Sequence, residues 1–287
     1  MDISPISRVM RRVDLAADGT AAGDTTATGF PSVDRWLGGG LRSGDLIVLG
    51  GDVGSGKSSL ALAMAVRIAQ DGRAVRFCST EMSPERTMER AIALEGRARV
   101  DDMRKGSLDD TARAGVGAAA VRMRDAMPTI TPVPDSVGDV IAHIESAGDE
   151  SRHGRDGGVV IVDSLQGLVG SASDETAEAE AAAVRAIKRA ALMQSVAVLL
   201  TTQLRRTAKP GEDHRPALAD FGALDAVRHH ADVVTAIYRE EMYHPDGGVE
   251  GGTEFLVLKN RNGATGYVDL YFYKQWLRFE DMLDPDR

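Results

Sequence analysis

The residues from Gly51 to Ser58 have the types and the spacing of a phosphate-binding loop. They match the pattern G-x-x-x-x-G-K-[ST], in which glycines let the backbone turn tightly and direct its N–H groups at phosphate oxygens. Lys57 would reach the terminal phosphates and Ser58 would offer its hydroxyl to Mg²⁺, while the start of the following helix adds partial positive charge. An apolar run, 46–49, precedes the loop and a helical pattern follows it, which argues against a chance glycine-rich turn. The sequence therefore predicts a nucleotide-binding protein. The predicted nucleotide-binding residues are Gly51, Asp52, Val53, Gly54, Ser55, Gly56, Lys57, Ser58 and Ser59.

Two carboxylates lie where a phosphoryl-transfer site would need them. Asp163 directly follows the apolar run 159–162, and its carboxylate could hold Mg²⁺ through water molecules. An aspartate in this place could also cap a helix, but the P-loop upstream favours the metal role. Glu81 lies just beyond the predicted strand 74–79, so we expect it at the edge of the sheet beside the P-loop strand. There it could act as the general base toward water, although a helix-start glutamate near Ser83 explains the residue equally well.

A third polar residue, Gln203, ends the apolar strand that the sequence predicts near 196–202. A neutral amide in this place could sense the γ-phosphate by hydrogen bonding without adding negative charge. A single glutamine is weak support by itself, so this role depends on the rest of the site.

The composition is that of a globular protein, with 287 residues of which 43% are hydrophobic. No apolar stretch approaches the length needed to span a bilayer, and residues 1–19 lack the apolar centre of a secretory signal. The single cysteine, Cys78, lies in a predicted buried strand, so a disulfide framework is excluded and we expect a cytoplasmic protein. The formal net charge of −9 argues against a broad basic surface, so nucleic acid would have to bind in a local basic groove.

Strand-like and helix-like segments alternate from Thr28 onward, which predicts an α/β fold with a mainly parallel sheet covered by helices on both faces. Near the C-terminus, alternating apolar and polar residues flank Asn260-Arg261-Asn262-Gly263, which predicts an antiparallel hairpin. No repeat or change of composition divides residues 28–287, so we expect one domain there. The expected strands cover 46–50, 74–79, 159–162, 196–201, 255–258 and 267–273, and the expected helices cover 57–70, 84–96, 107–127, 136–146 and 175–193.

Residues 1–27 are predicted to form an arm. Ile6, Val9, Met10 and Val13 recur at helical spacing with arginines opposite, and the Ala/Gly/Thr-rich stretch 19–28 is typical of a linker. A short amphipathic helix of this kind could fold back on its own domain or dock on a neighbouring subunit.

Together these motifs resemble the C-terminal motor domain of DnaB-type replicative helicases, within the RecA-like ATPases. The resemblance covers residues 28 to about 281 and implies the RecA-like P-loop fold, a twisted and mainly parallel sheet that ends in an antiparallel hairpin. Asp163 matches the family's Walker B aspartate, and Ser164 directly after it lies where the family usually has a tyrosine. The matching segments, in the family's order, are 28–34, 44–48, 79–83, 160–166, 202–204, 231–239 and 259–266.

The resemblance assigns roles to residues that are ambiguous by themselves. It implies that Glu81 activates water and that Gln203 is the phosphate sensor. It also implies that Arg261, with Lys259 beside it, enters the ATP site of a neighbouring subunit as an arginine finger. ATP and Mg²⁺ would then bind between the subunits of a homo-oligomeric ring, a hexamer in this family, with single-stranded DNA as the partner. Without the family, the two hairpin cations would be interpreted as solvated charges.

The chain departs from the family in the parts that flank the motor. Where the family has a separate N-terminal collar domain, this sequence has the short arm, so we expect a stand-alone motor. The arm resembles the linker helix that docks on an adjacent subunit. The loops expected to face DNA are acidic at 171–180 and lack the family's Arg-Glu-Ser-Gly run at 220–227, and an acidic lining would repel phosphates. Cations between these loops could contact the DNA backbone instead, or could be solvated. They are Arg205, Arg206, Lys209 and Arg215.

We therefore expect a Mg²⁺-dependent ATPase that assembles into a ring and moves along or unwinds DNA, as a replicative helicase does. The alternative is a RecA-like regulatory ATPase whose nucleotide cycle controls assembly or partner exchange without unwinding DNA. The order of the motifs favours the helicase, whereas the acidic loops and the arm in place of a collar favour the regulator.

Overall fold

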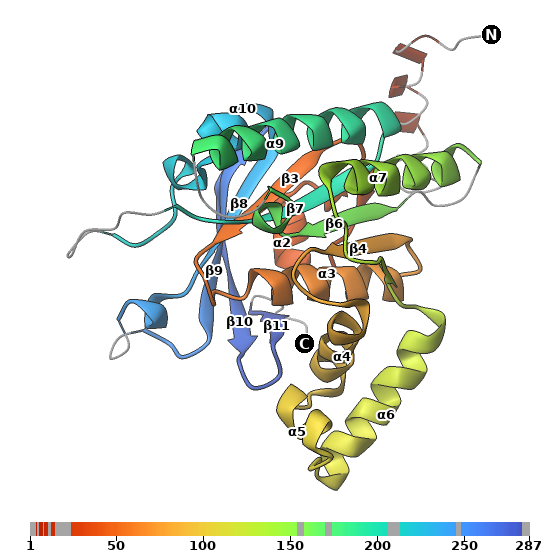
Figure 1. The fold of residues 1–287 in the computed structure, drawn as a ribbon, viewed down its shortest axis with the longest axis vertical. Coiled ribbons are helices and arrows are strands. Elements are labelled where there is room, and N and C mark those ends of the chain that lie inside the picture. The colour runs from red at the N-terminus through yellow and green to blue at the C-terminus, as the bar shows by residue number, and fades with distance from the viewer. Residues whose placement is uncertain are drawn as a thin grey trace.

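A twisted sheet with helices on both faces forms the body of the molecule (Figure 1). The computed structural model describes residues 4, 6, 7, 9, 10, 13, 14, 24–153, 158–169, 174–205, 213–244 and 248–282.

The strands in the described residues form a nine-stranded sheet and a separate two-stranded ribbon. The parallel part of the sheet has the order β8-β3-β7-β6-β4-β5, and the antiparallel strands β9, β10 and β11 extend it beyond β8. We call the edge at which the parallel strands end the carboxyl edge, and the edge at which they begin the amino edge. The strands are β1 (Thr25–Thr26), β2 (Leu41–Arg42), β3 (Leu46–Gly51), β4 (Val75–Ser79), β5 (Thr129–Ile130), β6 (Val159–Asp163), β7 (Ala197–Gln203), β8 (Val233–Tyr238), β9 (Gly252–Asn260), β10 (Gly266–Tyr273) and β11 (Arg278–Asp281).

Two layers of helices cover the sheet. In Figure 1, α7, α9 and α10 lie over one face, whereas α3 and α4 lie over the other, and α5 and α6 extend away from α4. Within the described residues, no helix is both long enough and apolar enough to cross a membrane. The helices are α2 (Pro31–Trp36), α3 (Lys57–Gln70), α4 (Pro84–Gly96), α5 (Val100–Lys105), α6 (Asp110–Asp125), α7 (Val137–Arg152), α8 (Leu165–Val169), α9 (Asp174–Gln194) and α10 (Ala226–His230), with short 3₁₀ turns η1 (Leu218–Phe221), η2 (Ala223–Asp225) and η3 (Glu240–Met242).

The central strands supply two hydrophobic cores because successive side chains point to opposite faces. On β3, Ile47 and Leu49 pack in the core under α3, whereas Leu46 and Val48 pack in the core under α9. All four are buried, so the strand is apolar throughout rather than alternating, as expected for a parallel sheet that is covered on both faces. The predicted fold class is confirmed.

Helices α3 and α4 have the predicted bounds, and both begin at strong local signals. Gly56 precedes α3 with φ of 105°, in the left-handed region that favours glycine. Ser83 precedes α4, and its Oγ accepts a hydrogen bond from the Arg86 N–H at 3.4 Å.

Other boundaries differ from the expectations. The helix expected over 107–127 begins later, because the carboxylate of Asp109 caps it by accepting the Ala112 N–H at 2.7 Å. The helix expected over 136–146 continues to Arg152. The periodicity also failed to indicate α5 and the last strand, β11.

The linker expected over 19–28 is wrong in its second half. Thr25 and Thr26 form β1, which pairs with β2, and Thr28 is fully buried. The backbone N–H and the hydroxyl of Thr28 both donate to Asp34 Oδ1 at 2.8 Å. These contacts join the segment to the domain, while residues 19–23 lie outside the described residues.

In the arm, the described residues at positions 6, 7, 9, 10, 13 and 14 are helical. Their apolar side chains are exposed: Ile6 by 76%, Val9 by 46%, Met10 by 53% and Val13 by 54%. These exposures do not support the alternative in which this stripe packs on its own domain.

Candidate nucleotide site

The P-loop joins the end of β3 to the start of α3, in the centre of the carboxyl edge. Gly54 and Gly56 have φ of 78° and 105°, so both need the conformational freedom of glycine. A Cβ at Gly56 would also lie 2.9 Å from the ring of Phe279 on β11. The loop is therefore held against the antiparallel strands, and the N-terminus of α3 faces the phosphate-binding position.

The Lys57 side chain lies across the loop. Its Nζ donates to the carbonyl oxygens of Gly51 at 2.8 Å and Asp52 at 2.9 Å. An ammonium group has three donors, so the third is available for a phosphate oxygen. Burial lowers the pKa of Lys57, while the carboxylates of Asp163, Asp52 and Glu81 act in the opposite direction. A bound phosphate would give the buried ammonium group of Lys57 an anionic partner.

Ser58 and Asp163 meet across the carboxyl edge. The Ser58 Oγ donates to Asp163 Oδ1 at 3.0 Å, and the Thr201 Oγ1 donates to the same oxygen at 2.7 Å. Burial raises the pKa of Asp163, and these two hydrogen bonds oppose that shift. The hydrogen bonds described for this carboxylate come from Ser58 and Thr201 rather than from a backbone N–H of α8, which favours the metal role over a helix cap.

This pair fits a Mg²⁺ ion. Mg²⁺ is usually held by one or two protein oxygens together with substrate phosphates and water, rather than by a cage of side chains. Ser58 and Asp163 provide such a set, and the described residues contain no separate cluster of three or more metal-ligating side chains.

Glu81 lies at the same edge, but β4 is not next to the P-loop strand as expected. Strands β7 and β6 separate β4 from β3, and only the common edge brings Glu81 toward the site. Its Oε1 accepts a hydrogen bond from the Ser164 Oγ at 2.9 Å. Glu81 also precedes the first residue of α4, whose cap is Ser83, and its carboxylate acts electrostatically on Lys57.

Gln203 is paired with Gly51 at the ends of adjacent strands β7 and β3. Its backbone N–H donates to Gln166 Oε1 at 3.0 Å, and Gln166 Nε2 donates to Thr202 Oγ1 at 2.9 Å. The sequence analysis did not predict that Gln166 contributes to the site. Its position three residues after Asp163 is the signal that could have indicated it. These hydrogen bonds connect the end of β7, where Gln203 lies, to the segment that follows β6.

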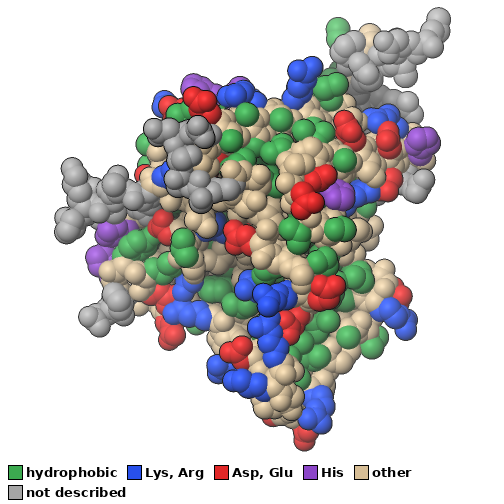
Figure 2. All heavy atoms as spheres, in the orientation of Figure 1, with side chains coloured by type: hydrophobic (Ala, Val, Ile, Leu, Met, Phe, Trp, Pro, Cys, Tyr) green, Lys and Arg blue, Asp and Glu red, His purple; other side chains and the backbone are tan. Residues whose placement is uncertain are grey.

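A cleft of about 530 Å³ adjoins the P-loop on the side of the antiparallel strands. It continues into a groove of about 300 Å³, which shares Arg90, Lys274 and Leu277 with it and adds Arg99 and Arg104. In Figure 2, Lys and Arg side chains gather in the region between α4 and the β10–β11 hairpin. Lysine and arginine side chains therefore line the cleft and the groove on this side of the P-loop.

Arg239 supports this wall of the site and was missed as a functional residue. It is 5% exposed, its Nη1 donates to the Gly54 carbonyl at 3.2 Å, and it forms a buried ion pair with Glu241. The position directly after the strand that ends at Tyr238 could have suggested an edge residue, but nothing in the sequence indicated contact with the P-loop.

Lys259 and Arg261 lie at the amino edge, opposite the P-loop. Arg261 Nη1 donates to Asp232 Oδ1 at 3.0 Å, and Asp232 Oδ2 accepts the N–H of Leu46, the first residue of β3. At about 3.3 Å per residue, the two ends of β3 are roughly 17 Å apart. The Nζ of Lys259 donates to the Arg228 carbonyl at 2.8 Å. The structure does not bring these cations to the P-loop of their own chain.

The structure describes part of the loops expected to face DNA, where Glu178 is exposed but Glu180 is not part of an acidic lining. Glu180 is 1% exposed, and its carboxylate pairs with Arg205 at 3.0 Å and accepts from Gln166 Nε2 at 3.3 Å. Arg215 forms two hydrogen bonds to Glu254, at 2.7 and 2.6 Å. Both described cations of this region are therefore engaged within the chain, while Arg206 and Lys209 lie outside the described residues.

The order of the parallel strands, the P-loop at the centre and the Ser58–Asp163 pair define a P-loop ATPase of the RecA-like class. Residues 25–281 match the family described as the DnaB-like helicase C terminal domain. The match covers most of the chain, so the protein belongs to this family.

Curated relatives and solved structures agree with this assignment. The chain is 31% identical over 268 residues to the replicative DNA helicase DnaB of Leifsonia xyli, covering 92% of this chain and 57% of that protein. It is 29% identical over 259 residues to the replicative DNA helicase DnaB of Geobacillus stearothermophilus, covering 89% and 56%. It thus spans little more than half the length of the curated relatives it matches. The fold resembles the ATPase domain of G40P with a TM-score of 0.83 at 22% identity, covering 98% of this chain and all of that one.

Proposed function

We propose that this protein is a Mg²⁺-dependent ATPase that works as a ring, with its ATP sites between subunits, and that it moves along single-stranded DNA. The observation that carries the proposal is the division of the motifs between two edges of one sheet. The P-loop, Asp163 and Glu81 share the carboxyl edge, whereas Lys259 and Arg261 lie at the amino edge. One subunit therefore cannot bring the P-loop and the hairpin cations to the same ATP site. In a ring, the amino edge of one subunit can supply its cations to the carboxyl edge of the next.

Each residue then has a role in hydrolysis. Lys57 binds the terminal phosphates, and Ser58 and Asp163 hold Mg²⁺, which when bound neutralises charge on the phosphate oxygens. Glu81 orients the attacking water and accepts its proton, with Ser164 fixing the carboxylate. Gln203 hydrogen-bonds the γ-phosphate from the adjacent strand end.

The hairpin cations complete the site of the neighbouring subunit in this scheme. Arg261, about half exposed, is accessible to a second copy, and Lys259 lies beside it. Their positive charge would stabilise the charge that develops on the transferred phosphoryl group.

A regulatory ATPase that does not act on DNA is the second candidate. The ion pairs of Arg205 with Glu180 and of Arg215 with Glu254 favour it, because cations engaged in this way contribute little to phosphate binding. The two candidates share the ATPase site and differ in their response to DNA.

Measurement of ATP turnover with and without single-stranded DNA separates the two candidates. A translocase should be stimulated several-fold, with a stimulation that declines as salt increases, because phosphate contacts release counterions. A regulator should hydrolyse ATP at the same rate in both conditions. The Lys57→Ala protein serves as the blank, and turnover equal to the wild type in that variant would contradict the proposed site.

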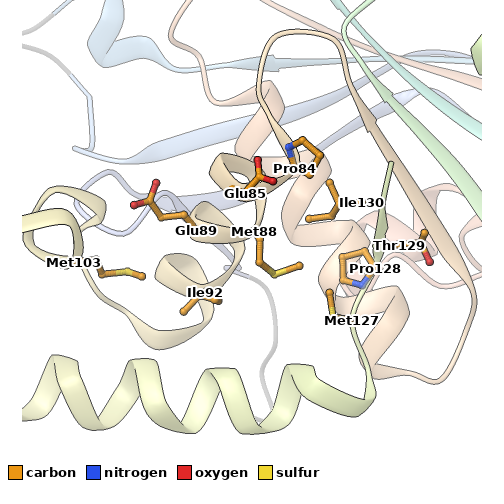
Figure 3. Close-up of a pocket in the computed structure, with 10 residues that line it drawn as sticks. All are labelled: Pro84, Glu85, Met88, Glu89, Ile92, Met103, Met127, Pro128, Thr129 and Ile130. Carbon is orange, nitrogen blue, oxygen red and sulfur yellow. The ribbon is translucent and has the colours of Figure 1, made fainter. Parts of the chain in front are cut away.

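We also propose that the arm docks on a neighbouring subunit. An apolar groove of about 860 Å³ lies between α4, α5 and the segment that leads to β5. Figure 3 shows Met88, Ile92, Met103, Met127 and Ile130 lining it. Glu85 and Glu89 also line this groove, and the arm carries an exposed apolar stripe with Arg8, Arg11 and Arg12 in its sequence. The apolar faces thus complement each other, and Glu85 offers a charge opposite to that of the arm, whereas Glu89 is paired with Arg104 at 2.6 Å.

Deletion of residues 1–19 is therefore expected to weaken the ring without unfolding the ATPase domain. Each apolar side chain that docks is worth about 1.5–3 kcal/mol before ordering costs, and about 1.4 kcal/mol corresponds to a tenfold change in affinity. We expect assembly, measured by light scattering, to require at least about tenfold more protein. ATP turnover should fall in parallel at low concentration and recover at high concentration. Assembly as tight as that of the full chain would rule out the docking role.

A further inference from the structure

The P-loop carries a carboxylate beside its lysine. Asp52 is the second residue of the loop, and its backbone carbonyl accepts hydrogen bonds from Lys57 Nζ at 2.9 Å and from the Ser55 N–H at 3.1 Å. The Asp52 carboxylate also acts electrostatically on Lys57, the cation on which triphosphate binding depends. A carboxylate that turned toward Lys57 would compete with the phosphates for the ammonium group.

Tyr243, which follows η3, holds this carboxylate from the other side. The Tyr243 hydroxyl donates a hydrogen bond to Asp52 Oδ2. A hydrogen bond to a charged acceptor is stronger than one between neutral groups, so it can decide which way the carboxylate points.

Neighbouring rings determine the position of Tyr243. Its ring stacks on His214 with centroids 4.5 Å apart and planes within 7°, and on Tyr238 with centroids 5.5 Å apart and planes within 11°. Tyr238 belongs to β8, next to the P-loop strand, so the hydroxyl is anchored to the central sheet. Because the stacking involves the ring alone, phenylalanine at position 243 can preserve it while removing the hydroxyl.

We propose that Tyr243 is a positioning residue for nucleotide binding, and that its hydroxyl keeps the Asp52 carboxylate away from Lys57 so that the ammonium group remains available to the terminal phosphates. The inference rests on the proposed nucleotide site and adds a residue that neither the P-loop motif nor the hairpin contains. It also explains how a loop with an internal negative charge can accept a polyanion.

A double-mutant cycle tests this. The affinity for a fluorescent, non-hydrolysable ATP analogue with Mg²⁺ is measured for the wild type, Tyr243→Phe, Asp52→Asn and the double variant. We expect Tyr243→Phe to weaken binding about tenfold, because a carboxylate that has lost the Tyr243 hydrogen bond can turn toward Lys57. In the Asp52→Asn background the same change should alter affinity by less than about twofold, because no charge remains to be held. Tyr271→Phe removes a hydroxyl on β10 and is the control.

Two results would overturn the inference: an unchanged affinity in Tyr243→Phe, or an equal loss with and without Asp52→Asn. If Tyr243→Phe does not fold, the affinity of Asp52→Asn decides, since removal of a restrained charge should tighten binding or leave it unchanged. A clear loss of affinity in that variant would contradict the proposal. If the wild type binds the analogue no better than Lys57→Ala does, the nucleotide site itself fails. If binding depends on Lys57 but the cycle shows no coupling between Tyr243 and Asp52, only this inference is contradicted and the nucleotide site stands.

Discussion

Replacing Arg261 with alanine is expected to lower ATP turnover by about 10³–10⁵-fold while each subunit still binds nucleotide. The range is that of arginine fingers in P-loop enzymes, where the guanidinium stabilises charge in the transition state more than in the ground state. Binding is preserved because Arg261 lies at the amino edge, bonded to Asp232 and to the His229 carbonyl, away from its own P-loop. Turnover and analogue binding are measured on the same preparation. Arg228→Ala, which removes an exposed cation near the same edge, should have little effect.

Mixing the Arg261→Ala and Lys57→Ala proteins tests whether the finger acts between subunits. With random assembly at equal amounts, roughly a quarter of the interfaces pair an intact P-loop with an intact finger, so partial activity should return. A finger acting within its own chain gives no such interface. Mixed assembly is shown separately with labelled subunits, and the absence of recovery in rings known to be mixed would contradict action in trans.

Replacing Glu81 with glutamine is expected to slow turnover by about 10²–10⁴-fold, the usual contribution of a general base. Glutamine keeps an Oε1 that can accept the hydrogen bond from Ser164, so the loop geometry should survive while the proton acceptor is lost. Nucleotide affinity should remain within a few-fold of the wild type. Single-turnover hydrolysis and analogue binding measure the two effects separately.

The matched control for Glu81 is Glu145→Gln, which removes an exposed carboxylate on α7. It should leave both turnover and affinity unchanged. Near-normal turnover in Glu81→Gln would show that another group accepts the proton, and a large loss of affinity would show that the carboxylate supports binding instead.

Local signals in the sequence were sufficient for the elements next to the P-loop. Helix α3 begins after a glycine that can adopt positive φ, and α4 begins at a serine cap followed by proline, so both were predicted with their observed bounds. The apolar strands β3 and β6 were predicted to within one residue because a strand buried on both faces is recognisable from composition alone. Features of this kind depend on contacts within a few residues.

Expectations failed where a distant partner decides the structure. The segment at Thr25 is rich in small and polar residues, yet it forms β1 because its backbone pairs with that of β2, a segment further along the chain. Glu180 is part of an acidic run in the sequence, but it is buried against Arg205 and Gln166. A carboxylate paired in this way does not line a channel, and no pattern within 171–180 indicates the pairing.

By itself, the sequence identified a P-loop, an aspartate at the end of an apolar strand, and the family whose motif order they follow. These features are recognisable because each is a short motif in which residue types at a fixed spacing indicate a mechanism. The tertiary structure alone decided which of these residues meet. The strand order places β7 and β6 between the P-loop strand and β4, sets Lys259 and Arg261 at the opposite edge, and brings Tyr243 to Asp52. Strand order depends on packing between segments far apart in the chain, and no pattern within a single segment indicates that packing.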